Sequence, residues 1–147
     1  MINSLSTKTM RVRNIFLAGL FGLIFVFHTG TGQARSLKSS ASIIGQWSGG
    51  GVVISSDGGR ERTRCHSSIR SSGARRYSVF ARCAIASLGT VDQRGIIRKI
   101  GRNSYRGRFR NDQYDVSGII TIRLQGNRQF VTLRSAKGNG HLVLRRR

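Results

Sequence analysis

From Ile43 onward, short apolar runs alternate residue by residue with polar side chains, and this pattern constrains the fold more than any other feature. Runs rich in Val, Ile, Tyr, Phe and Thr are separated by clusters of Gly, Asn, Asp and Ser, and no helical period emerges. Because the chain has no proline, its turns depend on glycine and asparagine. The pattern predicts an all-β domain of about eight strands, and the short connections favour an antiparallel meander, closed as a small barrel or folded as a sandwich.

We expect strands at residues 43–54, 61–71, 77–86, 95–100, 104–110, 114–124, 130–135 and 141–145. Side chains that fall every second residue point to the same face of a sheet. Apolar residues at such positions predict a single core, which the later strands build from Ile120, Ile122, Leu124, Val131, Leu133, Leu142 and Leu144.

Trp47 and the glycines that follow it mark the first expected strand. Trp47 is the only tryptophan, and we expect it in the core or plugging one end of a barrel, with stacking on a ligand as the alternative. The run Gly49-Gly50-Gly51 resembles a phosphate-cradling loop, but that chemistry needs a following helix, which the pattern does not predict. We therefore expect these glycines to kink the strand or to form a bulge.

Residues 1–34 have the three parts of a cleavable signal peptide. Lys8, Arg11 and Arg13 form a positive region, residues 15–27 form an uncharged apolar run, and small residues stand at positions 32 and 34. A membrane-spanning helix needs about 20 apolar residues, and the run at residues 15–27 is shorter, so we expect cleavage. An uncleaved membrane anchor is the alternative. Met10 is an alternative start of the chain. We expect a signal-peptide helix at 1–34, a flexible leader at 35–42 and a β domain at 43–147. The protein would be periplasmic or secreted, with no transmembrane span after cleavage.

Cys65 and Cys83 are the only cysteines. If they face each other in a hairpin, the turn centres on Ala74, in the one turn-like patch between the two runs, and Ile69 faces Val79. Directly opposed cysteines on an antiparallel pair can be bridged with little backbone distortion, and export favours oxidised cysteines. The sequence predicts a Cys65–Cys83 disulfide.

Positive charge dominates the composition, with 26 Lys and Arg against five Asp and Glu and a net charge of +21. Most of these side chains are arginine, which grips phosphate, sulfate and carboxylate groups bidentately. Strand alternation collects arginines on one face of the sheet, away from Tyr105 and Phe109. The predicted polyanion-binding residues are Arg106, Arg108, Arg110, Arg123 and Arg134.

The partner that this face predicts is an anionic polysaccharide or a phosphate-bearing component of the cell envelope. Two alternatives stay open. The arginines can form a solvated face that keeps the protein soluble. The domain can also be a protein–protein interaction module or inhibitor that has a protein partner and no polyanion ligand.

Few residues support catalysis or metal binding. After the predicted cleavage only His66 and His141 remain, and the acidic residues are scattered among predicted turns and strand ends. Paired-carboxylate hydrolysis needs two carboxyl groups that converge on a substrate. Cys65 and His66 are adjacent, so strand alternation points them to opposite faces. We expect neither an enzyme nor a metal or other cofactor, and a minor activity that uses the histidines is the alternative.

Three segments carry a resemblance to known proteins, namely GQWSGGG at 45–51, RERTRC at 60–65 and GNRQFVTLR at 126–134. With them the chain resembles a family of small exported bacterial proteins of unassigned activity. Members open with a Gly-x-Trp-x-Gly strand, have a basic run before the first cysteine, and have Gly-Asn-Arg-Gln before a late strand. The central segment GIIRKIGRNSYRGRFR departs from the family by being unusually basic. The resemblance implies export, a β fold and a Cys65–Cys83 bridge, and it carries over no catalytic or binding residue.

Overall fold

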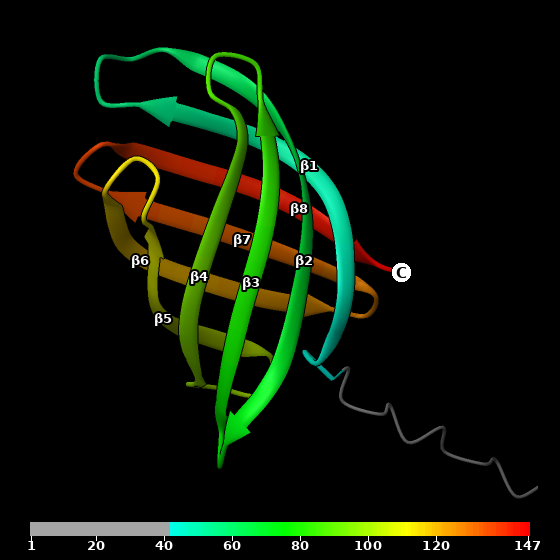
Figure 1. Ribbon diagram of the computed structural model, residues 1–147. Helices are drawn as coiled ribbons and strands as arrows, with labels where there is room; N and C mark the ends of the chain where they lie inside the picture. Colours follow the sequence, from blue (N-terminus) through cyan, green and yellow to red (C-terminus); the bar gives the residue numbers. More distant parts are fainter. Residues whose placement is uncertain (1–41) are drawn as a thin grey trace, which may run out of the picture. The chain divides into compact units, whose positions relative to one another are not determined.

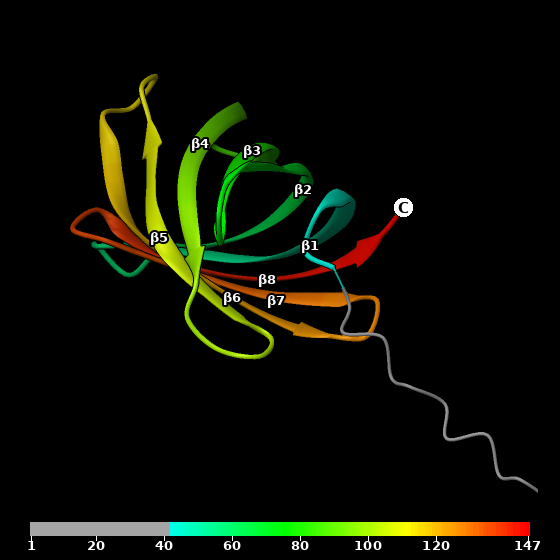
Figure 2. The ribbon, with the colours of Figure 1, turned by 90° about the horizontal axis from the view of Figure 1, so that it is seen from below.

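The eight strands of the protein form one closed antiparallel barrel (Figures 1 and 2). The computed structural model describes residues 42–147, so the predicted signal peptide, and the predicted leader apart from Ser42, lie outside the described residues. Each strand pairs with the next one in sequence, and β8 closes the barrel by pairing with β1. The strands are β1 (Gly45–Ser55), β2 (Arg60–Gly73), β3 (Arg76–Ile85), β4 (Gly89–Lys99), β5 (Ser104–Asn111), β6 (Val116–Gln125), β7 (Arg128–Ser135) and β8 (Gly138–Arg146). The predicted all-β meander is confirmed, and it is a barrel rather than a sandwich.

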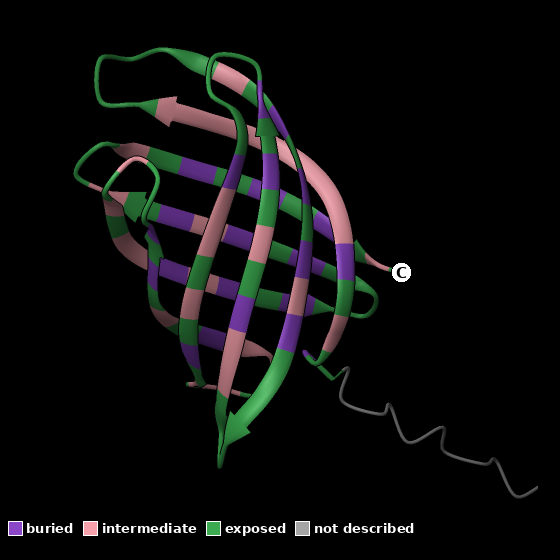
Figure 3. Cartoon of the chain, viewed as in Figure 1, coloured by how far each residue is buried: buried purple, intermediate pink, exposed green. Residues whose placement is uncertain are grey.

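Alternation within each strand sorts side chains between the inside and the outside of the barrel (Figure 3). In β7 and β8, for example, buried and less buried residues alternate almost without exception. The seven apolar residues predicted for the later strands all belong to one core cluster. The earlier strands add Trp47, Cys65, Ile69, Val79, Cys83, Ile97, Tyr105 and Phe109 to the same cluster. Among residues 42–147 there is no helix with the length and apolar character needed to cross a membrane.

Apart from the start of β4, every strand boundary lies within three residues of the sequence prediction. β4 begins at Gly89, six residues before the expected start at residue 95, because residues 89–94 alternate correctly but contain a single large apolar side chain, Val91. Val91 is buried, and β4 pairs with β3 along its whole length. β6 begins at Val116 instead of residue 114, because Asp115 has a positive φ of 47° and belongs to the preceding turn.

The hairpin between β2 and β3 carries the disulfide. Cys65 lies opposite Cys83 and Ile69 lies opposite Val79, as the sequence predicts. The sulfurs are bonded, and the two Cα atoms are 4.1 Å apart. The register shifts between Ser71 and Gly73, so the turn consists of residues 74 and 75, and Ala74, the predicted centre, is the first of the two.

Replacing both cysteines with alanine is expected to lower the free energy of unfolding by about 3 kcal/mol, because the unfolded chain loses a cross-link between residues 18 apart. Urea unfolding followed by far-UV circular dichroism measures the change. The natural protein should lose a similar amount when its disulfide is reduced, whereas the variant should not respond to a reducing agent. Equal stability in all of these samples would contradict the prediction.

Trp47 closes one end of the barrel, which we call the closed end. Its side chain is fully buried, and its indole Nε1 donates a hydrogen bond to the Ile43 carbonyl at 3.0 Å. The guanidinium of Arg146, from the last strand, lies over the indole ring at 4.3 Å from the ring centroid. Arg146 also donates to the carbonyl of Ile44 at 2.8 Å, so the first and last parts of the barrel are joined over the tryptophan.

Gly49 and Gly51 allow β1 to approach β8 closely. A Cβ atom at Gly49 would fall 2.2 Å from the Val143 carbonyl oxygen, and one at Gly51 would fall 1.9 Å from the His141 carbonyl oxygen. The register of β1 with both neighbours is unbroken through these glycines. The register therefore excludes a bulge in β1, which is one of the two alternatives that the sequence offers.

Candidate functional site

The five arginines predicted to bind a polyanion are all exposed on the outer face of the barrel. Arg106, Arg108 and Arg110 alternate along β5 with Tyr105 and Phe109, whose side chains are buried. The alternation that buries the two aromatic rings therefore also turns three guanidinium groups toward solvent.

Arg106, Arg108 and Arg110 form a stripe along β5, and the register between strands decides which other arginines continue it. Arg108 lies opposite Ile119 on β6, and Ile119 lies opposite Arg134 on β7, so Arg134 continues the row that passes through Arg108. Arg123 lies opposite Ser104, two residues further along β6 than Thr121, the residue that lies opposite Arg106. The structure thus aligns Arg134 with the β5 stripe and sets Arg123 apart, toward the closed end.

Three further arginines join the stripe from β3 and β4. Arg76 lies opposite Arg98, Arg98 lies opposite Arg106, and Arg94 lies opposite Arg110. Sequence reasoning missed these residues, although the predicted hairpin between residues 95–100 and 104–110, if centred on Arg102, pairs Arg98 with Arg106. The three arginines of β5 and the three that β3 and β4 add to them are called the arginine face: Arg76, Arg94, Arg98, Arg106, Arg108 and Arg110.

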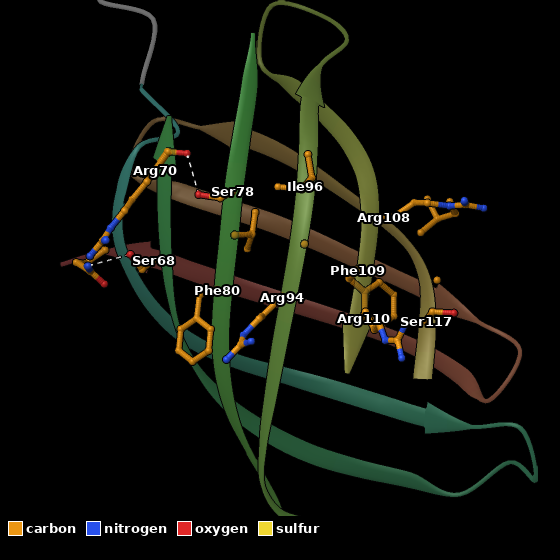
Figure 4. A pocket seen from close by; sticks show the side chains of 15 residues that line it. Ser68, Arg70, Ser78, Phe80, Arg94, Ile96, Arg108, Phe109, Arg110 and Ser117 are labelled. Atoms are coloured by element: carbon orange, nitrogen blue, oxygen red, sulfur yellow. Dashed lines mark hydrogen bonds between the residues drawn. The ribbon is translucent and has the colours of Figure 1, made fainter. Parts of the chain in front are cut away.

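A groove of about 1130 Å³ crosses the outer face from β1 to β6, and the arginine face supplies part of its lining (Figure 4). Phe80, Ile96 and Ile119 give the groove an apolar surface, and Phe80 and Ile96 remain 37% and 39% exposed. Figure 4 shows Phe80 beside Arg94, its cross-strand partner. The positive charges along the groove come from Arg70, Arg94, Arg108 and Arg110.

Two glycines let the strands beneath the groove lie close together. Gly95 and Gly118 both line it, and both lie opposite Phe109, on its two sides. A Cβ atom at Gly118 would fall 2.0 Å from the Arg134 carbonyl oxygen and 2.8 Å from the Phe109 ring. The neighbouring strands thus lie close together here, and the missing side chains are on the inner side of the wall, beside Phe109.

Few carboxylates neutralise the arginine face. Residues 42–147 contain two ion pairs, Arg82–Asp92 at 2.7 Å and Arg110–Asp112 at 2.5 Å. Hydrogen bonds from the Arg82 side chain lower the pKa of Asp92, and the positive charges of Arg82 and Arg94 lower it further. Neither ion pair involves Arg76, Arg98 or Arg106, so this row of three guanidinium groups has no carboxylate partner in the described chain.

The acidic residues are confined to one end of the barrel, whereas basic residues occur at both ends. All five acidic residues lie in, or within four residues of, the turns at the end opposite Trp47, which we call the mouth. They are Asp57, Glu61, Asp92, Asp112 and Asp115. At the closed end, each strand from β3 to β8 places an exposed arginine within three residues of its terminus, namely Arg76, Arg98, Arg106, Arg123, Arg128 and Arg145.

The described residues bring no metal-ligating cluster together. No group of three His, Cys, Asp or Glu side chains within residues 42–147 is placed to hold an ion. His66 and His141 are exposed and pair with Ser48 and Val52 respectively, so they stand on either side of β1 at different heights.

Comparisons with known proteins identify the fold. No protein-family model matches the sequence, and no curated protein matches it. A de novo designed fluorescence-activating β-barrel is similar with a TM-score of 0.56 at 17% identity, over 71% of this chain and 93% of the designed one. The redesigned barrels mFAP1 and mFAP0, both bound to DFHBI, have TM-scores of 0.58 at 10% identity, over 71% and 70% of this chain and 94% and 97% of theirs. At such identities the likeness is one of fold alone, and that fold is an antiparallel β-barrel.

Proposed function

We propose that this chain is an exported binding protein whose arginine face holds an anionic polymer of the cell envelope, one that bears phosphate or acidic sugar groups. The disulfide supports export, because structural disulfides persist in oxidising compartments. The arrangement of arginines supports the anionic ligand.

The observation that carries the proposal is the unbroken row formed by Arg76, Arg98 and Arg106 on three adjacent strands. Like charges directly opposite each other destabilise a sheet, by roughly 0.2–1 kcal/mol per pair. No ion pair offsets this repulsion in the described chain. A polyanion bound across the row would remove the repulsion and would gain bidentate contacts from each guanidinium.

The spacing of the arginines suits an extended ligand better than a single small ion. Arginines two residues apart on β5 are about 7 Å apart along the strand, and opposed arginines lie on strands about 5 Å apart. Arg94 and Arg110 form a second opposed pair, and Ile96 lies between this pair and the row of three. A polymer with a charge every few ångströms can contact both sets at once.

The groove also favours a ligand with some apolar surface. Phe80 and Ile96 are exposed beside the arginines, and an apolar ring face, such as that of a sugar, can cover them. A surface that serves solubility alone has no need of exposed aromatic and aliphatic side chains between its charges. Phe80 and Ile96 therefore weigh against the solvated-face alternative.

The expected result is salt-sensitive binding to long-chain polyphosphate and to alginate, followed by fluorescence anisotropy of the labelled polymers. Affinity should fall steeply between about 50 and 200 mM salt, because binding releases counterions from the polymer. Changing Arg94, Arg98, Arg106 and Arg108 together to glutamine should weaken binding by more than about tenfold and flatten the salt dependence.

A matched control removes the same charge elsewhere on the barrel. Arg60, Arg62, Arg64 and Arg145, all exposed, are changed to glutamine, and this variant should keep most of the affinity. Equal losses in the two variants, or no binding to either polymer at low salt, would overturn the proposal. A protein captured from envelope extract in high salt would favour the interaction module instead.

A further inference from the structure

A second cavity, of about 470 Å³, lies inside the mouth of the barrel. Small-molecule sites have volumes of roughly 300–1,000 Å³ and combine apolar walls with a few polar groups. This cavity has both. Its apolar walls include Val91, Phe109 and Leu133, which are buried, and Gln93, Asn111 and Ser135 add polar groups.

The inner side of β8 carries no side chain at the mouth. Gly138 and Gly140 alternate on the inner side of β8, opposite Ser135 and Leu133 on β7. Val53 on β1 faces Gly140 from the other side. An eight-stranded barrel is only just wide enough to be filled by its own side chains or to hold one small ligand. With glycine at both inner positions, β8 contributes only backbone to this side of the cavity, and the Leu133 side chain packs beside Gly140, 3.3 Å from where a Cβ atom would stand.

Hydrogen bonds between the turns hold the rim of the mouth in place. The Ser56 amide donates to the Lys137 carbonyl at 3.1 Å, and Lys137 Nζ donates to the Tyr114 carbonyl at 2.9 Å. Tyr114 Oη donates to the Leu88 carbonyl at 2.8 Å. These three bonds join the four turns of the mouth one after another, from the β1–β2 turn to the β7–β8, β5–β6 and β3–β4 turns.

A fourth contact completes the ring. The Ser87 amide donates to Glu61 Oε2 at 2.9 Å, and the Ser87 hydroxyl donates to Glu61 Oε1 at 2.5 Å, which ties the β3–β4 turn back to the start of β2. A rim that is already ordered does not lose further conformational freedom when a ligand enters. The mouth is thus built as a preformed site.

The charges of the cavity lining disfavour an anion. Its charged side chains are Asp57, Glu61 and Lys137. The Ser87 side chain and amide lower the pKa of Glu61, and the Ser55 side chain and the Gly59 amide lower the pKa of Asp57, so both carboxylates are ionised at neutral pH. Lys137 is the single positive group, and it is engaged with Tyr114.

We propose that the mouth binds a small, largely apolar molecule, such as an aromatic amine, that is neutral or carries one positive charge. The site is separate from the arginine face and does not depend on the function proposed for it. The chain would then present two sites of opposite preference, with anions bound on the outer wall and uncharged or cationic ligands bound inside the mouth.

Two dyes that share one ring system test this inference. N-phenyl-1-naphthylamine is neutral, and 8-anilino-1-naphthalenesulfonate is nearly the same molecule with a sulfonate added. The neutral dye should fluoresce on binding to the natural protein. Changing Gln93, which lines the mouth half-buried, to tryptophan should fill the cavity and reduce that binding at least tenfold. Changing Thr90, an exposed residue of the same strand, to tryptophan should leave it unchanged.

Further variants make the result decisive. Val53→Phe blocks the mouth from the opposite wall and replaces the first variant if Gln93→Trp does not fold. The variant with four arginines of the arginine face changed to glutamine should bind the neutral dye normally and the sulfonate dye less tightly. The inference is overturned if the neutral dye does not bind, if it binds both blocked variants as well as the natural protein, or if the sulfonate dye displaces it from the mouth with equal affinity.

Discussion

Changing Trp47 to alanine is expected to lower the free energy of unfolding by about 3–5 kcal/mol, one of the largest effects of any single substitution in this chain. The indole is fully buried in the core cluster, and nothing nearby can refill its volume without moving the barrel wall. The substitution also removes the hydrogen bond to the Ile43 carbonyl and leaves the Arg146 guanidinium without the ring beneath it. Urea unfolding followed by far-UV circular dichroism measures the loss, since the variant has no tryptophan fluorescence.

Two companion variants separate the contributions. Trp47→Phe keeps most of the buried area but loses the indole hydrogen bond, and it should cost less than half as much as alanine. Arg146→Gln keeps the indole and removes the cation, which should cost about 0.5–2 kcal/mol. A loss below about 1 kcal/mol for Trp47→Ala would show that the closed end tolerates a cavity and that Trp47 does not hold it together.

Changing Gly107 to alanine is expected to destabilise the protein by about 3 kcal/mol or more, or to prevent folding. A Cβ atom at this position would fall 1.9 Å from the Ile96 carbonyl oxygen and 2.6 Å from the Ile97 Cα. Both are backbone atoms of the neighbouring strand, so no side-chain rotation can relieve the overlap. The soluble yield and the urea midpoint of the variant measure the effect.

Gly101 provides the matched control, six residues earlier in the same hairpin. The nearest atom to a Cβ at Gly101 is the Ser104 Cβ at 3.6 Å, which is an ordinary contact. Gly101→Ala should therefore change stability by no more than about 0.5 kcal/mol. If both glycine variants are equally stable, the close approach of β4 and β5 at Gly107 is not a constraint on the fold.

The sequence predicts the later strands well because their apolar residues recur strictly every second position. Ile120, Ile122 and Leu124 are buried as expected. The opposed pair Cys65 and Cys83 follows from placing one turn between two clear strands. In each case the local pattern and the tertiary contacts agree, so local reasoning is sufficient.

The same reasoning fails where pairing, not composition, defines the structure. Residues 89–94 contain one large apolar side chain, and they form a strand because β3 offers a partner along the whole length. Gln129 is fully buried in a strand whose other buried residues, Val131 and Leu133, are apolar. Alternation places Gln129 inside, but a polar side chain in the core cannot be inferred from composition.

The candidate sites likewise contain features that the pattern of one strand predicts and features that depend on the pairing of strands. Alternation alone turns Arg106, Arg108 and Arg110 outward, but Arg76 and Arg94 join them only through the register of β3, β4 and β5. The mouth cavity depends on contacts between turns far apart in sequence, such as Ser56 with Lys137 and Tyr114 with Leu88. No property of a single strand predicts that these turns meet.

Because all five carboxylates lie at the mouth while basic residues lie at both ends, the net positive charge is greater at the closed end, and the barrel has an electric dipole along its length. Near a negatively charged wall, such a body experiences a torque before it touches anything, over a distance of about 8–10 Å at physiological ionic strength. The closed end, which contains Trp47, is drawn toward the wall, and the mouth, which contains the carboxylates, is turned away from it. Under the function proposed above, the barrel would approach the envelope with its closed end leading, would bind along the arginine face on its side, and would keep its mouth accessible to solutes in the surrounding solution.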